Sequence, residues 1–459
     1  MADRTSALPT QSEPARTGPT STGPTSTGPD FGFPAPLWRA VARRRPPLPR
    51  FRSPLRGPWL TSVFAVVLLV GLPIVIVTGL LSYIAYGPQF GQAIPGDVGP
   101  LHLPWFDWPA SPSWLYRLTQ GLHVGLGIVL VPVVLAKLWS VVPKLFGWPP
   151  VSSMAQALER LSLLGLVGGI LFEIVTGLLN IQYDYVFGFS FYLAHYVGAW
   201  VFLTSFVAHV VLKLPVMVRA LRSRSLRAEL RTSTADTGAE EPDATGLVAA
   251  DPRPPTLSRR GALAVVFGGA GLIGLITVGQ TLDPLRRLAF LLPRGRNTAA
   301  GDGGPDDFPI NKTFAVTGIA QQAVGDGWRL DLTGGPRAVR LDLPGLAAQP
   351  QHTAELPLAC VEGWSSVQTW TGVRLRDLAA LAGVPAPTSA VVRSVEPGGP
   401  FAQATLTAGQ VLHPDSLLAT AVNGAPLSLD HGFPARVIAS AVPGVHNTKW
   451  VRSIEFRSA

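Results

Sequence analysis

The chain has 459 residues, of which 14% are charged and 47% apolar, and its mean hydropathy is +0.30. Soluble domains carry about 25% charged residues, so this composition indicates a membrane protein. The formal net charge of +9 would suit a nucleic-acid surface. However, the basic residues lie mainly beside long apolar runs, where they mark membrane flanks, so we expect no nucleic-acid partner.

Residues 1–57 contain repeated Gly-Pro-Thr-Ser units without apolar periodicity, which predicts a disordered arm. Four apolar runs follow, and each is long enough to cross a hydrocarbon core of about 30 Å. One such run alone would also suit a buried helix of a soluble protein, but four in succession predict an all-α transmembrane bundle over residues 58–221. The runs cover residues 59–86, 114–139, 161–181 and 191–213.

Lysine and arginine residues gather at one end of these runs. Arginines precede the first run, Lys137 and Lys144 close the second, and Lys213 begins a basic segment after the fourth. The connecting segments 88–113 and 182–190 contain neither residue type. Because cytoplasmic loops carry the excess of Lys and Arg, we expect the N-terminal arm to be cytoplasmic.

Residues 222–258 are polar and have the composition of a cytoplasmic linker. In residues 259–282, which follow, the pair Arg259 and Arg260 introduces a Gly- and Ala-rich apolar stretch. This pattern resembles a twin-arginine export signal placed internally, which implies the export machinery as a partner. A plain fifth transmembrane helix is the alternative. Both interpretations give a fifth anchor helix and place the following residues outside the cytoplasm.

Three histidines lie in the apolar runs or near their ends. His123 is early in the second run, and His195 and His209 are in the fourth. A separation of 14 residues puts the last two on one helix face, about 21 Å apart, the spacing of two haems stacked across a bilayer. Ionisable groups are costly in a membrane, so haem ligation is favoured over hydrogen bonding between helices. We expect His123 and His195, both near the outer end, to ligate one haem iron.

The four-helix pattern resembles the cytochrome b561-like and formate-dehydrogenase gamma-type quinone-linked cytochromes, which implies haem b and a quinone or quinol partner. An inner haem in those families commonly takes a second histidine from the first helix, and this chain has none there. One haem is therefore expected, and a second haem ligated by His209 is the alternative. Glu173 in the third run serves proton or quinone chemistry, or pairs with a neighbouring helix.

Residues 305–459 have the alternating pattern and β-branched content of a strand-rich α+β domain. Strands are expected in FAVTGIA, WRLDLTG, RAVRLDL, SAVVRSVEP, ARVIASAVPG and WVRSIEF. Short helices are expected in VRLRDLAALAGV and PDSLLATAVNG. The sequence thus predicts a helical membrane bundle followed by a domain in which strands dominate.

Cys360 is the only cysteine of the chain. A lone thiol is a buried apolar side chain, a reactive group or a soft metal ligand. Its context LACVEGWS, with DHGFPAR and HNTKW further on, resembles the sulfite-oxidase-type molybdenum domain. The variant CVEGWS is closest to the periplasmic methionine-sulfoxide reductase catalytic subunit of bacteria. The resemblance implies that the Cys360 thiolate binds molybdenum beside the dithiolene of one molybdopterin, as suits a soft metal centre.

The same resemblance implies cofactor contacts at matching positions. His431 and Arg436 match residues that bind the pterin and its phosphate, and Lys449 matches a basic contact, since Arg and Lys donate to phosphate oxygens. Without the resemblance these would be ordinary surface groups. The other matching positions are Asn311, which corresponds to an asparagine at the pterin, and Asn447 and Thr448, which contribute through backbone groups.

Sulfite oxidases follow the ligand cysteine with a Gly-Asn-Arg run that supplies a cation for sulfite, where this chain has Glu362, Gly363 and Trp364. Sulfite oxidation is therefore less favoured than reduction of an S- or N-oxide by oxygen-atom transfer. The combined prediction is a multi-pass, molybdenum-dependent oxidoreductase of a bacterial cell membrane, in contact with lipid, that exchanges electrons between the quinone pool, haem b and an outer molybdenum site. Oxidation of sulfite or another small sulfur compound is the alternative reaction. A non-catalytic haem sensor or assembly factor is the alternative of another class.

Overall fold

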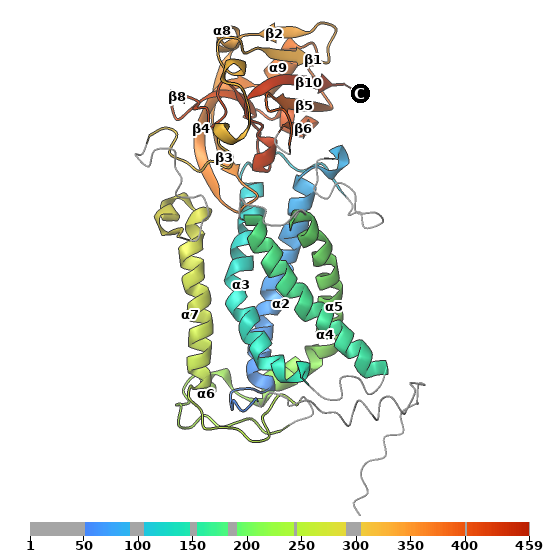
Figure 1. Cartoon of the computed structure of the whole chain (residues 1–459), viewed down its shortest axis with the longest axis vertical. Helices are drawn as coiled ribbons and strands as arrows, with labels where there is room; N and C mark the ends of the chain where they lie inside the picture. The colour runs from blue at the N-terminus through green and yellow to red at the C-terminus, as the bar shows by residue number, and fades with distance from the viewer. Residues whose placement is uncertain are drawn as a thin grey trace, which may run out of the picture.

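A computed structural model describes residues 51–91, 105–146, 154–181, 191–242, 246–290, 304–399 and 402–458 of the chain. The predicted N-terminal arm lies outside these residues up to position 50, as do parts of the two connecting segments that lack Lys and Arg. In Figure 1 the described residues form a bundle of long helices with a sheet-containing domain at one end.

Five helices among the described residues are long and apolar enough to cross a membrane. α2 packs against α3, α4 packs against α5, α2 also contacts α5, and α7 stands beside α3 (Figure 1). Leu68, Leu130 and Phe202, from three different helices, share one buried core. The helices are α2 Pro58–Ala85, α3 Leu115–Leu145, α4 Met154–Ile181, α5 Phe191–Ser223 and α7 Arg259–Thr277.

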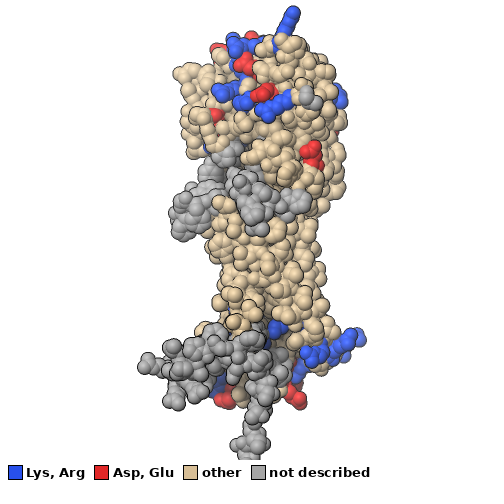
Figure 2. Space-filling model, turned by 90° about the vertical axis from the view of Figure 1, so that its right-hand side faces the viewer, with Lys and Arg blue, Asp and Glu red and all other residues tan. Residues whose placement is uncertain are grey.

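Apolar side chains cover the outward faces of these helices. Val70, Leu164, Val211 and Val265 are 62%, 65%, 68% and 67% exposed. On the face drawn in Figure 2, the middle of the molecule lacks charged side chains, which gather instead toward the two ends. A continuous apolar surface of this kind is unfavourable in water and suits contact with hydrocarbon chains.

The start of α7 is fixed by a cap and by a buried ion pair. Ser258 Oγ accepts a hydrogen bond from the N–H of Gly261 at 3.1 Å. Arg259 is 1% exposed and donates to Glu229 Oε2 at 3.3 Å. Glu229 ends the short helix α6, Leu226–Glu229, so part of the segment predicted as a linker packs against the beginning of α7.

The C-terminal domain contains two sheets that share one core. The first has the order β2-β1-β10-β5-β6, with β1 parallel to β10, and the second has the order β3-β4-β7-β8, with β9 also paired to β7. Leu332, Leu418, Val437 and Phe456, from four strands of the two sheets, lie in a single buried cluster. The hairpin of β3 and β4 extends toward the bundle (Figure 1).

The strands are β1 Leu330–Thr333, β2 Val339–Leu341, β3 Gln351–Ala359, β4 Ser365–Arg374, β5 Ser389–Ser394, β6 Gln403–Thr407, β7 Leu417–Val422, β8 Ala425–Pro426, β9 Arg436–Ile438 and β10 Val451–Arg457. The short helices of this domain are α8 Leu343–Ala347, α9 Leu375–Leu381 and α10 Ala408–Leu412. The 3₁₀ segments are η1 Pro88–Phe90, η2 Val278–Gln280, η3 Asp283–Leu288, η4 Phe314–Val316, η5 Gln321–Ala323 and η6 Gly444–His446.

Two sequence predictions within this domain are wrong. FAVTGIA forms the turn η4 instead of a strand, because Asp430 Oδ1 accepts a hydrogen bond from the N–H of Phe314 at 2.7 Å and Gly318 has a φ of +72°. PDSLLATAVNG contains strand β7 instead of a helix, since β4 and β9 pair with it on both sides. The prediction also missed β3, although exposed Thr353 and buried Ala354 belong to a clear alternation along that strand.

Candidate functional site

Cys360 lies in the tight loop that joins β3 to β4. The N–H of Cys360 donates to the carbonyl of Trp364 at 2.8 Å, and the N–H of Gly363 donates to the carbonyl of Cys360 at 3.1 Å. Gly363 has a φ of +94°, which glycine adopts readily and other residues do not. The loop therefore holds the Cys360 side chain, which is 5% exposed, at a fixed place at the end of the hairpin.

A second segment, residues 431–450, packs beside this loop. An ideal Cβ on Gly444 would lie 2.9 Å from the carbonyl oxygen of Ala359 and 3.5 Å from the Cα of Cys360, so this approach requires a glycine. Ala359 also forms an isolated parallel bridge with Pro443. The run HNTKW is thereby placed close to the cysteine.

Arg436 is buried beneath this run. Its guanidinium donates to the carbonyl of His431 at 3.0 Å and to the carbonyl of Asn447 at 3.3 Å, and it lies 5.2 Å from the ring centre of Trp370. Burial lowers the pKa of Arg436 to about 9. Arg436 thus ties two backbone segments together, and its Nε has no hydrogen-bond partner among the described residues.

His431 is a buried and uncharged side chain of the same segment. Burial, followed by the nearby charges of Arg436 and Lys449, lowers the pKa of His431 to about 3. Its Nε2 lies 3.0 Å from the carbonyl oxygen of Asp306, which favours the tautomer with the proton on Nε2. The ring stacks on Phe308 with centroids 3.8 Å apart. The His431 side chain is therefore neutral near pH 7 and contributes a packed ring, not a positive charge, to the site.

Lys449 is the buried amine of the site. Its Nζ donates to the carbonyls of Lys312 at 2.7 Å and of Asp430 at 2.8 Å. Burial and the charge of Arg436 hold the pKa of Lys449 well below its usual value, while Asp430 and Cys360 act in the opposite direction.

Several buried polar atoms here have no hydrogen-bond partner among the described residues. They include Asn447 Nδ2, Thr448 Oγ1 and both ring nitrogens of His446. Buried polar atoms without partners are costly, so a cluster of them indicates a polar ligand. Asn447 and Thr448 border a small hollow with about 270 Å³ of empty space, the adjoining open solvent included. Its other lining residues are Asn311, Lys312, Gly444, Val445, Lys449 and Trp450.

The sequence analysis missed two residues of this site. Burial lowers the pKa of His446 to about 4, and its ring centre lies 6.1 Å from that of Tyr86 in the bundle. Lys312 pairs with Glu396, and its carbonyl holds Lys449. Their positions next to Asn311 and Asn447 were the only signal in the sequence.

In the bundle, His123 on α3 and His195 on α5 lie with ring centroids 6.0 Å apart. Two imidazoles that ligate one metal through nitrogens at about 2 Å have ring centres about 6 Å apart. His123 Nδ1 lies 2.9 Å from the carbonyl oxygen of Val75, and His195 Nδ1 lies 3.0 Å from Thr176 Oγ1. Each ring is thus held through Nδ1, and each Nε2 is left for a metal.

Glu173 and two glycines complete this part of the bundle. Glu173 Oε2 lies 3.1 Å from His195 Nδ1, so the carboxyl group pairs with a residue of the neighbouring helix α5. An ideal Cβ on Gly79 would lie 2.7 Å from His123 Cε1, and one on Gly177 would lie 3.3 Å from His195 Cε1. Small residues on α2 and α4 therefore make room for the two rings.

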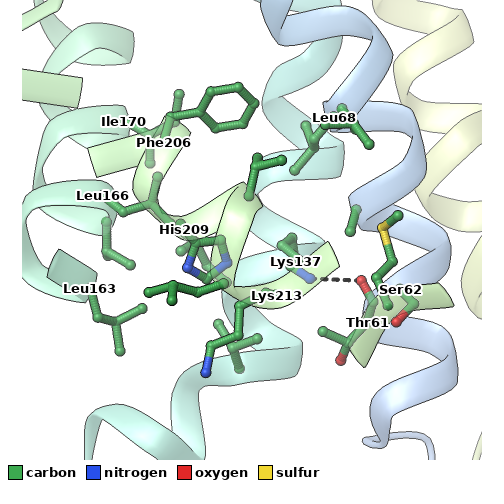
Figure 3. Close-up of a pocket in the computed structure, with 18 of the residues that line it drawn as sticks. Thr61, Ser62, Leu68, Lys137, Leu163, Leu166, Ile170, Phe206, His209 and Lys213 are labelled. Atoms are coloured by element: carbon green, nitrogen blue, oxygen red, sulfur yellow. Dashed lines mark hydrogen bonds between the residues drawn. The ribbon is translucent and has the colours of Figure 1, made fainter. Parts of the chain in front are cut away.

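His209 does not join the other two histidines. It lies about 21 Å further along α5 and lines a separate cavity in the other half of the bundle (Figure 3). The structure therefore brings together Cys360 with the predicted contacts of the second segment, and His123 with His195, but it leaves His209 apart from both groups.

The loop of Cys360 rests on the end of the bundle. Gln120 Nε2 on α3 donates to the carbonyl of Val361 at 2.5 Å, and Thr281 Oγ1 donates to the carbonyl of Gly363 at 3.2 Å. Ser82 Oγ on α2 hydrogen-bonds to Gln120 Oε1 at 2.9 Å and orients the amide. These bonds fix the loop about one helical turn from His123.

An aromatic junction, formed by Tyr83, Tyr86, Tyr192 and Tyr196, fills the same interface. The rings of Tyr83 and Tyr196 stack with centroids 4.8 Å apart, and the ring centroids of Tyr86 and Tyr192 are 5.4 Å apart. Tyr196 follows His195 in the sequence, while Tyr86 contacts His446 of the second segment. The junction therefore extends from the histidine pair to the neighbourhood of Cys360.

Residues 317–459 match the model of a family described as the oxidoreductase molybdopterin binding domain. The "Uncharacterized oxidoreductase YuiH" of Bacillus subtilis (strain 168) is 35% identical over 117 residues, which cover 25% of this chain and 58% of YuiH. Sulfite oxidase of Arabidopsis thaliana is 39% identical over 100 residues, which cover 18% of this chain and 25% of the plant enzyme. The solved structure of the sulfane dehydrogenase SoxCD of Paracoccus pantotrophus is 22% identical, with a TM-score of 0.27, and the match covers 29% of this chain and 39% of that one.

Residues 317–459 are thus a molybdopterin-binding oxidoreductase domain of the sulfite oxidase family. The chain accordingly carries the oxidoreductase domain of that enzyme superfamily. It spans 58% of YuiH and only 25% of the plant sulfite oxidase. The match includes Cys360 and the second segment, whereas Asn311 and the histidines of the bundle lie outside it.

The geometry of the site fits molybdopterin. The unpaired polar atoms of Asn447 and Thr448, the buried amine of Lys449 and the hollow beside them suit an anionic ligand rich in oxygen. The thiol of Cys360 suits a soft metal. The chemistry of these residues therefore agrees with a molybdopterin site, since they offer donors for its polar groups and a thiol for its metal.

Proposed function

We propose that the protein is a molybdenum-dependent oxidoreductase of a bacterial cell membrane. Electrons pass between the quinone pool, a haem b held in the bundle and a molybdenum site outside the cytoplasm, and the preferred reaction is reduction of an S- or N-oxide by oxygen-atom transfer. The hydrogen bond from Gln120 to Val361 carries this proposal, because it joins the loop of Cys360 to α3 about one turn from His123.

At the outer site, Cys360 would supply a thiolate ligand to the metal. Lys449, Asn447 and Thr448 bind the polar groups of the pterin, and Arg436 keeps its Nε for a phosphate oxygen. Bound molybdopterin supplies a metal that exchanges one oxygen atom and two electrons with a substrate. His431 stays neutral at physiological pH and supports the site through its stacking on Phe308.

In the bundle, His123 and His195 are the residues that would hold haem b. Bound haem supplies one-electron transfer. Val75, Thr176 and Glu173 hold the Nδ1 atoms and so keep both rings oriented toward the iron. A single haem fits this geometry, because His209 lies in a different cavity.

The residues near Cys360 favour a neutral substrate over an anion. Glu362 is 8% exposed, and its Oε2 accepts a hydrogen bond from Trp364 Nε1 at 2.8 Å, so a carboxylate stands two residues from the metal ligand. Arg374 contacts His352, and Arg393 pairs with Glu455, so these cations are engaged elsewhere. Oxidation of sulfite or another small sulfur compound is the alternative, since the direction depends on relative potentials.

The five long apolar helices and their exposed side chains support a multi-pass position in lipid. The distribution of Lys and Arg in the sequence supports a cytoplasmic N-terminus and an outer C-terminal domain. If the pair Arg259 and Arg260 acts as a twin-arginine signal, the export machinery transfers the C-terminal domain after folding. A haem sensor or assembly factor is disfavoured, because such a protein would not need unpaired donors beside Cys360.

The experiment that tests this function is metal analysis of detergent-purified protein together with its reduced-minus-oxidised spectrum, for the wild type and Cys360→Ser. The expected result is stoichiometric molybdenum, a b-type haem band, and reductase activity that the variant loses. Haem without molybdenum would favour the sensor, and molybdenum without haem would remove the bundle from the electron path.

A further inference from the structure

The inner half of the bundle contains a cavity between α2, α3, α4 and α5. It holds about 1500 Å³ of empty space, its open mouth included. Apolar side chains such as Leu68, Leu166 and Phe206 form most of its wall (Figure 3). Lys137 from α3 and His209 from α5 are directed into the same space (Figure 3).

One end of the cavity is strongly basic. Lys137, Lys144 and Lys213 line it together with His209, and none of the described residues in its lining is Asp or Glu. Lys137 Nζ donates to the carbonyl of Thr61 at 2.8 Å, which uses one of its three hydrogens (Figure 3). The cavity therefore suits a long apolar molecule whose head carries hydrogen-bond acceptors.

We propose that this cavity is the binding site for an isoprenoid quinol, which makes it the electron entry of the proposed function on which the inference rests. The head ring lies between Lys137 and His209, and the tail follows the leucine-rich wall. Lys137 donates to one ring oxygen, and His209 accepts a proton from the hydroxyl on the other. A hydrogen bond to an ammonium group also stabilises the negative charge that develops on the ring oxygen during oxidation.

The chemical step balances within this arrangement. Two O–H bonds of the quinol break and two C=O bonds form, which releases two protons and two electrons. The first proton passes to His209 and the second to water at the basic mouth near Lys144 and Lys213. The electrons would leave singly toward the haem that His123 and His195 would hold, and that haem would be the oxidant. Phe202 at the far end of the cavity is seven residues from His195, about 10 Å along the helix axis.

Two other occupants are less suited to the cavity. A second haem held by two histidines would need another imidazole, yet His209 is the only histidine among the described residues of the lining, and Lys137 is bound to a backbone carbonyl. The head of an anionic phospholipid would pair with the lysines, but it carries no hydroxyl proton that His209 would need to accept.

The test measures binding of menadione and oxidation of its quinol by the full chain in nanodiscs. The variants are Lys137→Met and His209→Gln. Thr204→Ala is the control on α5, because Thr204 is exposed and its hydroxyl donates to the carbonyl of Trp200 on the same helix. We expect the dissociation constant for menadione to rise about tenfold or more in both variants, as for loss of one charge-assisted hydrogen bond. We expect unchanged binding in the control and unchanged haem per chain in all forms.

Three results would overturn the inference: wild-type menadione binding in both variants, loss of half the haem in His209→Gln, or loss of bound phospholipid in the variants with no effect on menadione. Because binding is measured without turnover, the assay decides the question even if the protein holds no haem or molybdenum. A protein without haem or molybdenum would contradict the proposed function, while the binding result would still decide whether the cavity binds a quinone. If a variant is misfolded by gel filtration, Lys137→Gln and His209→Asn replace it.

Discussion

Gly363 in the loop of Cys360 lies against Val124 of α3, so closely that an ideal Cβ on the glycine would be 2.7 Å from the Cβ and Cγ1 atoms of the valine. Val124 follows His123 directly. The loop that holds the thiol and the helix that holds a proposed haem ligand are therefore in van der Waals contact, one residue from that ligand.

Gly363→Ala should uncouple the two parts of the molecule. The added methyl group collides with Val124, and the alanine backbone would have to keep the positive φ of Gly363, which is strained for alanine. The loop should therefore move away from α3. We expect quinol-driven reduction of the oxide to fall at least about tenfold, equivalent to about 1.4 kcal/mol in the barrier. Activity driven by reduced methyl viologen, which reaches the outer site directly, should fall much less.

Gly424→Ala is the matched control for this substitution. Gly424 also has a positive φ, of +82°, but an added Cβ would have nothing within 4 Å. The control should keep the wild-type ratio of quinol-driven to viologen-driven activity. An equal loss of both activities in Gly363→Ala would mean that the substitution damages the turn at Cys360, and not the contact with the bundle.

Tyr86 gives a second test of the interface, through the aromatic junction. Its ring contacts Tyr192 on α5 and His446 in the second segment, so Tyr86→Leu removes the aromatic group that spans the two parts. We expect stopped-flow reoxidation of the haem by an oxide substrate to slow several-fold in Tyr86→Leu and to stay near the wild-type rate in Tyr86→Phe. Equal rates in both variants would exclude an electronic role for the ring.

Much of this architecture could be predicted from the sequence, because it follows from local patterns. Long apolar runs predict helices whatever their neighbours are, and the helical depths of His123 and His195 predict that they meet. The motif around Cys360 predicts the outer site. The failures concern segments whose structure depends on distant partners. Strand β7 is rich in Leu and Ala, which favour helices, yet β4 and β9 pair with it.

The coupling of the two parts could not be predicted for the same reason. Gln120 and Val361 are 241 residues apart, and neither residue type indicates a partner. The role of His446 was equally hidden, since only the folded structure places its ring beside Tyr86. The inner cavity depends on side chains from four helices, so no single segment of the sequence reveals it.

The histidine pair predicts different effects of three substitutions on haem content. His123→Leu and His195→Leu each remove one of two imidazoles whose centroids are 6.0 Å apart, so each should abolish the b-type band. His209→Leu is the control on the same helix as His195 and should retain it. Haem content measured by the pyridine haemochrome assay checks this. Retention of the band in His195→Leu would contradict the assignment of the axial ligands.

The buried histidines of the C-terminal domain predict that its stability falls in acid. The pKa of His431 is lowered to about 3 and that of His446 to about 4, against about 6.5 in the unfolded chain. Between these values the folded state binds fewer protons than the unfolded state. The free energy of unfolding therefore increases as the pH rises from the folded-state pKa of each group to about 6.5, and it decreases as the pH falls through the same range. The change is at most about 1.4 kcal/mol per pH unit for each group.

His431→Gln should reduce this pH dependence. Glutamine can still donate to the carbonyl of Asp306 but does not titrate, so the thermal midpoint of the variant should be lower at pH 7.5 and should fall less between pH 7 and pH 5. Gln403→Ala, at an exposed position of β6, removes no titratable group, so it is the control and should follow the wild type. Parallel curves for His431→Gln and the wild type would assign the acid sensitivity to other groups.

The inner cavity and the outer Cys360 together predict that turnover moves charge across the membrane. If quinol is oxidised between Lys137 and His209, two electrons travel outward to the molybdenum site. Transfer of one charge across the whole membrane at 100 mV changes its free energy by about 2.3 kcal/mol. A potential that is negative on the cytoplasmic side therefore favours reduction of an oxide and opposes the alternative oxidation.

Proteoliposomes with a potassium gradient and valinomycin measure this effect. With methionine sulfoxide outside, only molecules with an outward molybdenum site are assayed. Menadiol-driven reduction should be faster when the interior is negative than when it is positive. Reduction driven by external reduced methyl viologen should depend little on polarity, since those electrons do not cross the bundle. If menadiol-driven rates are equal at both polarities, quinol must instead be oxidised near the outer surface, and the inner cavity would not be the point of electron entry.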